Sequence, residues 1–186
     1  MSSKAWKTFE RRVRDMFGAA YGFDFTRVAN SGAGEMVKGD IMPKDLLRTR
    51  TFPFTVEVKL LTSRSISLEN MLLSWKDTLW EWWCQVVVES EHNTETLEGG
   101  MSSPLLVFKT SGSGTVPLAM VRSKDIRHDL SNGVPMKPGI VLTVCIRMRK
   151  KIKMGTGWRW GKEVIGEWDE TLLLGKLEDL LPLCAK

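Results

Sequence analysis

The pattern of apolar positions near the start of the chain predicts a helix followed by several strands. Over residues 3–19, apolar side chains recur at helical spacing and would form one face: Trp6, Phe9, Val13, Met16 and Phe17. Beyond Gly22, apolar residues alternate with polar ones or stand in short unbroken runs, the patterns of half-buried and buried strands. These runs predict strands at 23–30, 39–43, 53–61, 104–109, 116–122 and 141–148.

A second long helix is expected between the third and fourth of these strands. It begins where Ser67 can act as a cap and continues to about residue 89. Trp75, Trp80 and Trp83 lie close to helical spacing on it and are expected to pack on the sheet or on a second subunit. Polar composition predicts connections at 44–52 and 90–103. The later part of the chain predicts a short helix, a hairpin and a final helix at 123–129, 158–168 and 169–181.

The order of the predicted elements indicates an α/β fold of the mixed α+β kind. A helix, three strands, a second helix and two further strands would form a central mixed sheet flanked by helices. The order strand, loop, strand among the first three strands predicts an antiparallel meander. A chain of 186 residues is long enough for one domain with a sizeable core. We expect residues 1–130 to form that core and residues 131–186 to form a basic, β-rich, α-ended extension packed on it.

The charge of the chain favours a polyanionic partner. Its net charge is +5 and its pI is about 9.2, while its hydrophobic and charged fractions are those of an ordinary globular protein. The three cysteines are far apart and form no CxxC pair, so neither a zinc site nor a disulfide framework is expected. The sequence contains no recognisable signal peptide or membrane span. We therefore expect a cytoplasmic protein.

The strand TVEVKLL, residues 55–61, carries charges that a buried strand does not require. Residues two apart in a strand point to the same side, so Glu57 and Lys59 share a face. A hairpin with the preceding strand would bring Asp40 beside Glu57, and two carboxylates at that separation repel each other. A divalent cation such as Mg2+, which prefers oxygen ligands, would remove the repulsion. The ammonium group of Lys59 would then stand where it could orient or deprotonate an attacking water.

The same three residues also fit a simpler hypothesis. Asp40, Glu57 and Lys59 could form the solvated face of an edge hairpin, with Glu57 and Lys59 as a weak surface ion pair. Their spacing is loose enough to occur often by chance. The residues around them therefore bear on the choice between a catalytic site and a solvated surface.

Those neighbouring residues resemble the PD-(D/E)xK nuclease superfamily, and within it most closely the Holliday-junction resolvase branch, which includes phage-type members. RVANSGAGEMVKGDIMP is followed by FTVEVKLL. The order of that branch is matched by Glu10, Arg27, Ser31, Gly39-Asp40 and Glu57-Val58-Lys59. The resemblance covers about residues 5–125. Gly39 stands where the superfamily's name has a proline, a replacement that is common in this branch.

The resemblance implies a restriction-endonuclease-like core and a metal-dependent site. Asp40 and Glu57 would bind Mg2+, for which Mn2+ could substitute, with the Val58 carbonyl as a plausible third ligand. Lys59 would position or activate the attacking water. Hydrolysis of a phosphodiester bond is the reaction that this arrangement implies.

Outside the metal motif, the resemblance implies supporting roles. Glu10 on the first helix would complete the acidic cluster through a water or a second metal ion, and Ser31 and Arg27 would contact the region of the scissile phosphate. Simpler alternatives are a charged helix face for Glu10, within FERRVRD, and a turn for Ser31. Many superfamily members place a glutamine on the helix after the lysine strand, so Gln85 is a lesser candidate, although a solvent-facing glutamine is the commoner case.

Two basic regions could contact a phosphate backbone. From Leu130 to Lys162 the chain has eight basic residues and no acidic one, and five of the eight are clustered: Arg147, Arg149, Lys150, Lys151 and Lys153. Such charge gives salt-dependent affinity without sequence information. The alternative is a solvated turn. Near the proposed site, a second basic surface could be formed by Lys38 with Arg11, Arg12, Lys44, Arg48 and Arg50.

We therefore predict a Mg2+-dependent, structure-selective DNA endonuclease, most closely a Holliday-junction resolvase. The resemblance implies a homodimer whose two sites nick opposite strands of a branched junction, in a bacterial, archaeal or phage-infected cell. One alternative is another nuclease of the superfamily, of restriction, repair or nicking type. The others are a non-catalytic nucleic-acid-binding protein on the same fold and a structural or interaction domain. Metal-dependent cleavage would identify an enzyme. Binding of nucleic acid without cleavage would distinguish the non-catalytic binding protein from the structural or interaction domain.

Overall fold

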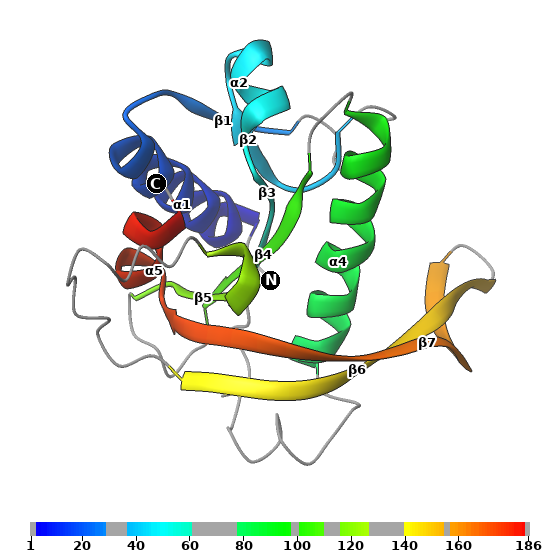
Figure 1. The fold of residues 1–186 in the computed structure, drawn as a ribbon. Helices are drawn as coiled ribbons and strands as arrows, with labels where there is room; N and C mark the ends of the chain where they lie inside the picture. Colours follow the sequence, from blue (N-terminus) through cyan, green and yellow to red (C-terminus); the bar gives the residue numbers. More distant parts are fainter. Residues whose placement is uncertain are drawn as a thin grey trace.

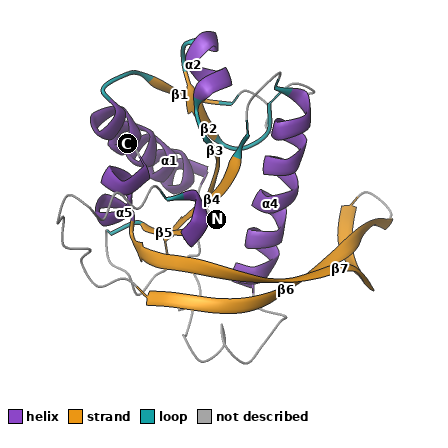
Figure 2. Cartoon of the chain, viewed as in Figure 1, coloured by secondary structure: helices purple, strands orange, loops and turns teal. Residues whose placement is uncertain are grey.

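The computed structural model describes residues 3–28, 37–60, 78–97, 101–109, 116–126, 140–154 and 157–184. The helices are α1 (Ser3–Tyr21), α2 (Leu46–Thr51), α4 (Thr78–Thr96), the 3-10 helix η2 (Ser123–Asp125) and α5 (Leu177–Cys184). The strands are β1 (Phe25–Arg27), β2 (Ile41–Pro43), β3 (Phe54–Leu60), β4 (Ser103–Lys109), β5 (Leu118–Arg122), β6 (Ile140–Met154) and β7 (Gly157–Lys176). Figures 1 and 2 show the sheet with helices on both sides. The predicted α/β fold with a flanked mixed sheet is therefore confirmed, and it is consistent with a restriction-endonuclease-like core.

The seven described strands form one sheet in the order β1-β2-β3-β4-β5-β7-β6. β1, β2 and β3 form the predicted antiparallel meander, with Ile41 opposite Val56. β3 and β4 run parallel, and α4 lies between them in the chain as the crossover that a parallel pair needs. The other neighbouring strands are antiparallel. Glu57 therefore lies on an interior strand of the sheet.

Alternation along the strands gives the sheet two apolar faces. On one face, Val56 and Val58 pack with α1 and α5 in a buried cluster. On the other face, the strands pack against Trp80 and Trp83 of α4, as predicted. Because Glu57 stands between Val56 and Val58, its side chain is directed to the face that α4 covers.

The predicted connection at 44–52 contains a helix, α2. Its first turn is capped by Asp45, whose carboxylate accepts a 2.8 Å hydrogen bond from the backbone N–H of Leu47. Thr49 is buried beneath the helix, and its hydroxyl donates to the carbonyl of Pro43 at 3.1 Å. Six residues are too few to display a helical period, so the capping aspartate was the one signal in the sequence.

α4 continues beyond the predicted end at residue 89 and occupies part of the predicted loop at 90–103. The last turns of α4 are polar for a different reason than solvent exposure in a loop. Ser90 and Asn93 are 1% and 2% exposed and are buried against the rest of the molecule. The start of the predicted helix, including Ser67 and Trp75, lies outside the described residues.

The last part of the chain differs most from its prediction. Residues 158–168 do not form a hairpin of their own, and residues 169–176 are not helical, because Gly157–Lys176 is one long strand, β7. β7 pairs with β6 along its length and with β5 near its end. The register of the β6–β7 pair shifts twice around Arg149, so glycines that resemble turn signals are accommodated inside a strand. The final helix begins later than predicted, and of the short helix predicted at 123–129 the described part is η2.

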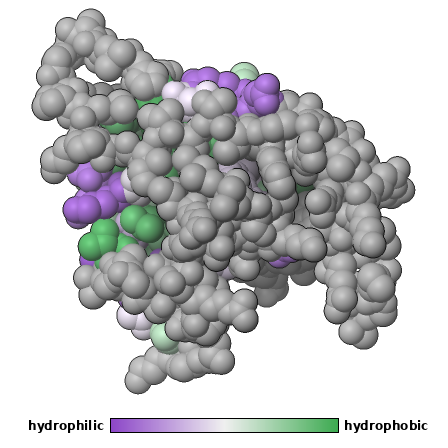
Figure 3. Space-filling model, turned by 90° about the horizontal axis from the view of Figure 1, so that it is seen from below, coloured by the Kyte–Doolittle hydropathy of each residue, from purple (hydrophilic) through white to green (hydrophobic). Residues whose placement is uncertain are grey.

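Seen from below, hydrophilic and hydrophobic groups lie next to each other in small patches (Figure 3). Among the described helices, none is long and apolar enough to cross a membrane.

Candidate active site

The backbone around Gly39 places Asp40 at the side of β3. Gly39 has a φ of 105°, and a Cβ atom at this position would lie 3.0 Å from the carbonyl oxygen of Val56. The N–H of Asp40 donates to that same carbonyl at 2.8 Å. The Asp40 carboxylate accepts a 2.8 Å hydrogen bond from the N–H of Val58. A glycine before the aspartate is therefore a steric requirement of the close approach between this segment and β3.

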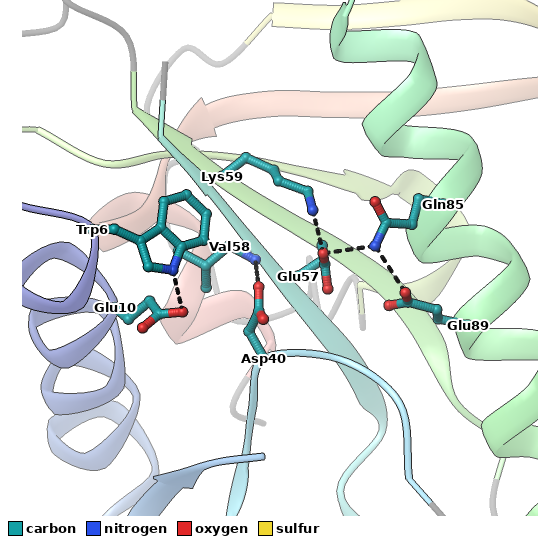
Figure 4. Close-up of polar contacts among 8 residues, drawn as sticks. All are labelled: Trp6, Glu10, Asp40, Glu57, Val58, Lys59, Gln85 and Glu89. Carbon is teal, nitrogen blue, oxygen red and sulfur yellow. Dashed lines mark hydrogen bonds and ion pairs between the residues drawn. The ribbon is translucent and has the colours of Figure 1, made fainter. Parts of the chain in front are cut away.

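Glu57 and Lys59 lie on the face of β3 that points to α4 (Figure 4). Glu57 is 4% exposed, and the ammonium group of Lys59 forms an ion pair with its Oε1. Gln85 of α4 donates from Nε2 to Glu57 Oε1 at 2.8 Å and to Glu89 Oε1 at 2.9 Å. Because Glu57 is buried on an interior strand, the alternative of a solvated edge hairpin is wrong. Gln85 faces the carboxylates and not the solvent.

Burial and the charge of a neighbouring carboxylate raise the pKa of both carboxyl groups. Burial, and next the charge of Glu57, raise the pKa of Asp40 to about 7, although the Val58 N–H and the Lys59 ammonium act in the opposite direction. Burial, and next the charge of Glu89, raise the pKa of Glu57 to about 7, with Lys59 again opposing. A cation bound between these groups would favour their ionised forms, so the site is electrostatically suited to a divalent metal ion.

These raised pKa values predict how stability depends on pH. In the unfolded chain the two carboxyls release their protons near pH 4, and in the metal-free folded protein they do so near pH 7. The folded state binds more protons between these values, so this contribution to the free energy of unfolding falls as pH rises through the window. Mg2+ binding displaces the protons and should therefore stabilise the protein more at about pH 8 than at about pH 5.5.

Thermal unfolding in EDTA and in Mg2+ at these two pH values measures the effect. The matched control is the double variant Asp40→Asn/Glu57→Gln, which lacks both titrating groups and should show a smaller pH dependence and no shift with Mg2+. Equal Mg2+-induced shifts at both pH values in the natural protein would contradict the prediction.

Glu10 lies on α1, on the other side of Asp40 from Glu57 (Figure 4). It is 1% exposed, so the alternative of a solvated helix face is wrong. Its carboxylate accepts a 2.6 Å hydrogen bond from Trp6 Nε1 and pairs with Arg27 Nε at 2.7 Å. The charge of Glu10 also makes a small contribution to the raised pKa of Asp40. Glu10 therefore borders the site with both oxygens already engaged.

The other predicted site residues differ in their exposure and in the elements that carry them. Arg27 leaves 43% of its side chain exposed while it pairs with Glu10. The side chain of Val58 is fully buried, and its N–H binds Asp40. Lys38 is partly buried just before Gly39. Ser31 lies outside the described residues. The basic cluster falls on β6, at one edge of the described sheet: Arg147, Arg149, Lys150, Lys151 and Lys153.

Sequence reasoning missed two polar residues of α4 that face the site. Glu89 shares the Gln85 amide with Glu57, and Asn93 binds the backbone of Lys38. Gln85, Glu89 and Asn93 recur at four-residue intervals, which places them on one face of a helix. That spacing was visible in the sequence, but it is informative only once the helix is known to continue to Thr96.

The oxygen donors present fit a hard divalent cation. Asp40 and Glu57 are two carboxylates within electrostatic reach of each other, and Mg2+ is usually bound in proteins by one or two carboxylates together with waters and substrate phosphates. Among the residues that the structure describes, no group of three His, Cys, Asp or Glu side chains is placed to hold a metal ion. Further ligands would therefore come from the backbone, from water or from a bound phosphate.

One family of proteins matches most of this chain. The model of the family described as "Phage putative PDDEXK endonuclease" matches residues 3–156, which include α1, β2, β3 and α4. No match was found among curated proteins or among solved structures.

Proposed function

The chain belongs to the phage PD-(D/E)xK endonuclease family, and on this basis we propose that it is a Mg2+-dependent DNA endonuclease centred on Asp40, Glu57 and Lys59. The observation that carries the proposal is the pair of carboxylates with raised pKa values, the partly buried Asp40 and the buried Glu57, the latter ion-paired to the lysine of the motif. A pair of this kind is costly without a cation and becomes favourable with one.

Each residue of the site has a proposed task. Asp40, Glu57 and the Val58 carbonyl would bind the cation. When bound, Mg2+ supplies Lewis acidity to the phosphate that is attacked. Lys59 is ion-paired to Glu57. With the charge of Glu57 compensated by the cation, the ammonium group would be free to donate to the attacking water and orient it.

The groups around the centre would assist. Gln85 keeps Glu57 oriented through its amide. Glu10 pairs with Arg27, whose partly exposed side chain would contact the scissile phosphate together with Ser31. A second metal ion near Glu10 would require the carboxylate to leave Trp6 or Arg27, so we favour this supporting role for Glu10.

The substrate that we favour is branched DNA. The resemblance to Holliday-junction resolvases implies a homodimer whose two sites nick opposite strands, and a four-way junction offers two equivalent cleavage points to a two-fold dimer. Residues 131–186 would act as an extension of the nuclease core that contacts DNA, in the cytoplasm of the infected cell. The alternatives are another nuclease of restriction, repair or nicking type and a non-catalytic DNA-binding protein.

Cleavage of a labelled four-way junction beside a linear duplex of the same sequence, with Mg2+ and with EDTA, tests the proposal. Paired, symmetric nicks confined to the junction and dependent on Mg2+ are expected. Equal cutting of the duplex would retain the nuclease and reject the junction specificity. Tight binding without cutting under Mg2+ or Mn2+ would favour the non-catalytic alternative.

The basic cluster on β6 makes a separate prediction about salt dependence. Replacing Lys150, Lys151 and Lys153 by glutamine should weaken binding to any DNA sequence, because phosphate contacts carry no sequence information. The slope of log K against log salt should decrease by about 0.9 for each phosphate contact that is lost. Fluorescence anisotropy in Ca2+ measures the slope. The control replaces three exposed lysines elsewhere, Lys7, Lys124 and Lys176. An equal decrease in both triple variants would assign the effect to net charge.

A further inference from the structure

Asn93 is a buried amide that binds the backbone just before Asp40. It is 2% exposed on the face of α4 that covers β3. Its Oδ1 accepts from the N–H of Lys38 at 2.7 Å, and its Nδ2 donates to the carbonyl of Lys38 at 3.0 Å. Nδ2 also donates to the hydroxyl of Thr55 at 2.7 Å. The side chain therefore occupies both polar backbone groups of one residue, as a neighbouring strand would.

The two residues after Lys38 have little freedom of their own. Gly39 is in the left-handed region and lies against the carbonyl of Val56, and Asp40 donates its N–H to the same carbonyl at 2.8 Å. Asn93 thus holds one end of the Lys38–Asp40 segment and β3 holds the other. The position of the Asp40 carboxylate relative to β3 depends on both ends.

Asn93 is itself anchored to the strand that carries Glu57. Thr55, which accepts from the Asn93 amide, lies two residues before Glu57 on the same face of β3. The Thr55 hydroxyl is also hydrogen-bonded to that of Ser102, next to the start of β4, at 2.6 Å. Asn93 therefore connects the Asp40 segment directly to β3 and not to a flexible surface.

We propose that Asn93 is a positioning residue that sets the separation of Asp40 from Glu57 and thereby the affinity of the site for a divalent cation. This inference rests on the proposed function. A bridging cation tolerates only a narrow range of ligand positions, and Mg2+ demands near-ideal geometry. Residues that orient metal ligands typically contribute about 10–100-fold to metal affinity.

The test compares metal binding in Asn93→Ala with that in Ser90→Ala. Ser90 is an equally buried polar residue of the same helix, but its hydroxyl donates to the carbonyl of Val87, within α4. Calorimetric titration with Mg2+ and Mn2+ is expected to show an affinity that is lower by about 10–100-fold in Asn93→Ala and unchanged in Ser90→Ala. Thermal unfolding in EDTA gives the stability of each variant, so a general loss of stability is measured separately from a loss of affinity.

The outcomes separate this inference from the proposed function. Natural affinity in a folded Asn93→Ala variant would overturn the inference and leave the nuclease intact. If the natural protein neither binds metal nor cleaves DNA, the proposed function fails and the inference fails with it. If Asn93→Ala does not fold, Thr55→Val decides, since it removes one anchor of the Asn93 amide and retains a β-branched residue in the strand. Lower affinity in Thr55→Val supports the inference, and natural affinity overturns it.

The first turn of α2 is a second, independent feature. Leu46 and Leu47 are 77% and 75% exposed, although the helix beneath them is well fixed. Asp45 caps it, and the guanidinium of Arg48 lies 4.4 Å from the ring centre of Phe23. Two adjacent leucines are therefore held rigidly in solvent at an end of the molecule, where α2 projects (Figure 1).

We infer that these leucines insert between bases of bound DNA. Lys44, Arg48 and Arg50 flank them in the sequence, and the adjacent Asp45 is engaged in the cap, so the charge of this segment complements phosphates. Apolar wedges flanked by basic residues are used by DNA-binding proteins to unstack base steps. α2 joins β2, which follows Asp40, to β3, which carries Glu57, and this inference rests on the proposed function.

A four-way junction with 2-aminopurine beside the branch point tests this inference, with the double variant Leu46→Ser/Leu47→Ser. The natural protein is expected to increase the fluorescence of the base analogue in Ca2+, and the variant should lose that increase while it still binds Mg2+ as the natural protein does. No increase with the natural protein, or the same increase with both proteins, would overturn the inference. A natural dimer that becomes monomeric in the variant during gel filtration would also overturn it, because the surface would then be an interface between two copies.

Discussion

Asp40→Asn is expected to abolish cleavage and to leave DNA binding largely intact. The substitution keeps an acceptor for the Val58 N–H, so the backbone of the site can remain in place. It removes one of the two charges that would bind the cation, and metal ions contribute several kcal/mol of transition-state stabilisation. Since each 1.4 kcal/mol is a factor of ten in rate, a loss of roughly 10³-fold or more should be measured in single-turnover cleavage. Glu57→Gln should behave in the same way.

Although Asp40→Asn should lose activity, its stability in the absence of metal should not decrease. Asp40 is partly buried beside another carboxyl group, so the metal-free protein at about pH 8 carries two repelling charges that Asp40→Asn reduces to one. The variant should therefore unfold at the same or a higher temperature in EDTA, while losing the stabilisation by Mg2+. Asp24→Asn, the same change at an exposed aspartate, is the control and should cleave normally. If both Asp40→Asn and Glu57→Gln cut at natural rates, the site is elsewhere.

Lys59→Met should reduce cleavage by about 10²–10⁴-fold, the range typical of a positioned acid–base group. Methionine retains much of the apolar stem of the lysine, and the side chain is only 19% exposed, so packing should change little. The ion pair with Glu57 is lost, and the pKa of Glu57 should rise further because Lys59 opposes the effect of burial. Metal affinity near pH 7 should therefore decrease and recover at higher pH, whereas the cleavage rate at saturating Mg2+ should not recover.

A pH series of single-turnover rates beside calorimetric metal titrations separates these two effects. The control is Lys176→Met, which breaks an exposed pair with Glu178 whose separation is 3.9 Å and which should change neither quantity. A rate that returns to the natural value once the site is saturated with metal would mean that Lys59 serves only the charge balance of Glu57.

Local patterns in the sequence were sufficient to predict the centre of the fold. The apolar positions of residues 3–19 correspond to a helix that packs on the sheet, and the alternation around Glu57 corresponds to β3. The position of Asp40 beside Glu57 followed from the prediction that two consecutive strands pair as a hairpin, and Ile41 indeed lies opposite Val56. These features depend on contacts between neighbouring segments, and such contacts leave a periodic spacing of apolar residues that can be recognised in the sequence.

Features that depend on distant contacts were not predictable in this way. Nothing local distinguishes the polar residues of α4 from a loop, because Asn93 is buried by the backbone of Lys38, which is 55 residues earlier in the chain. The burial of Glu10 likewise depends on Arg27 and on the packing of α1. β7 is a strand because β5 and β6 supply partners for both of its edges, while its own glycines favour turns.

The length of the hairpin formed by β6 and β7 can change independently of the sheet around Glu57. β7 pairs with β5 only over Leu172–Lys176, and its earlier residues pair with β6 alone among the described strands. The outer part of the hairpin extends past α4 (Figure 1). Equal insertions or deletions in the two strands would lengthen or shorten this arm without moving β3 or α4. Under the proposed function, such changes would alter how far the protein reaches along DNA while Asp40, Glu57 and Lys59 stay in place.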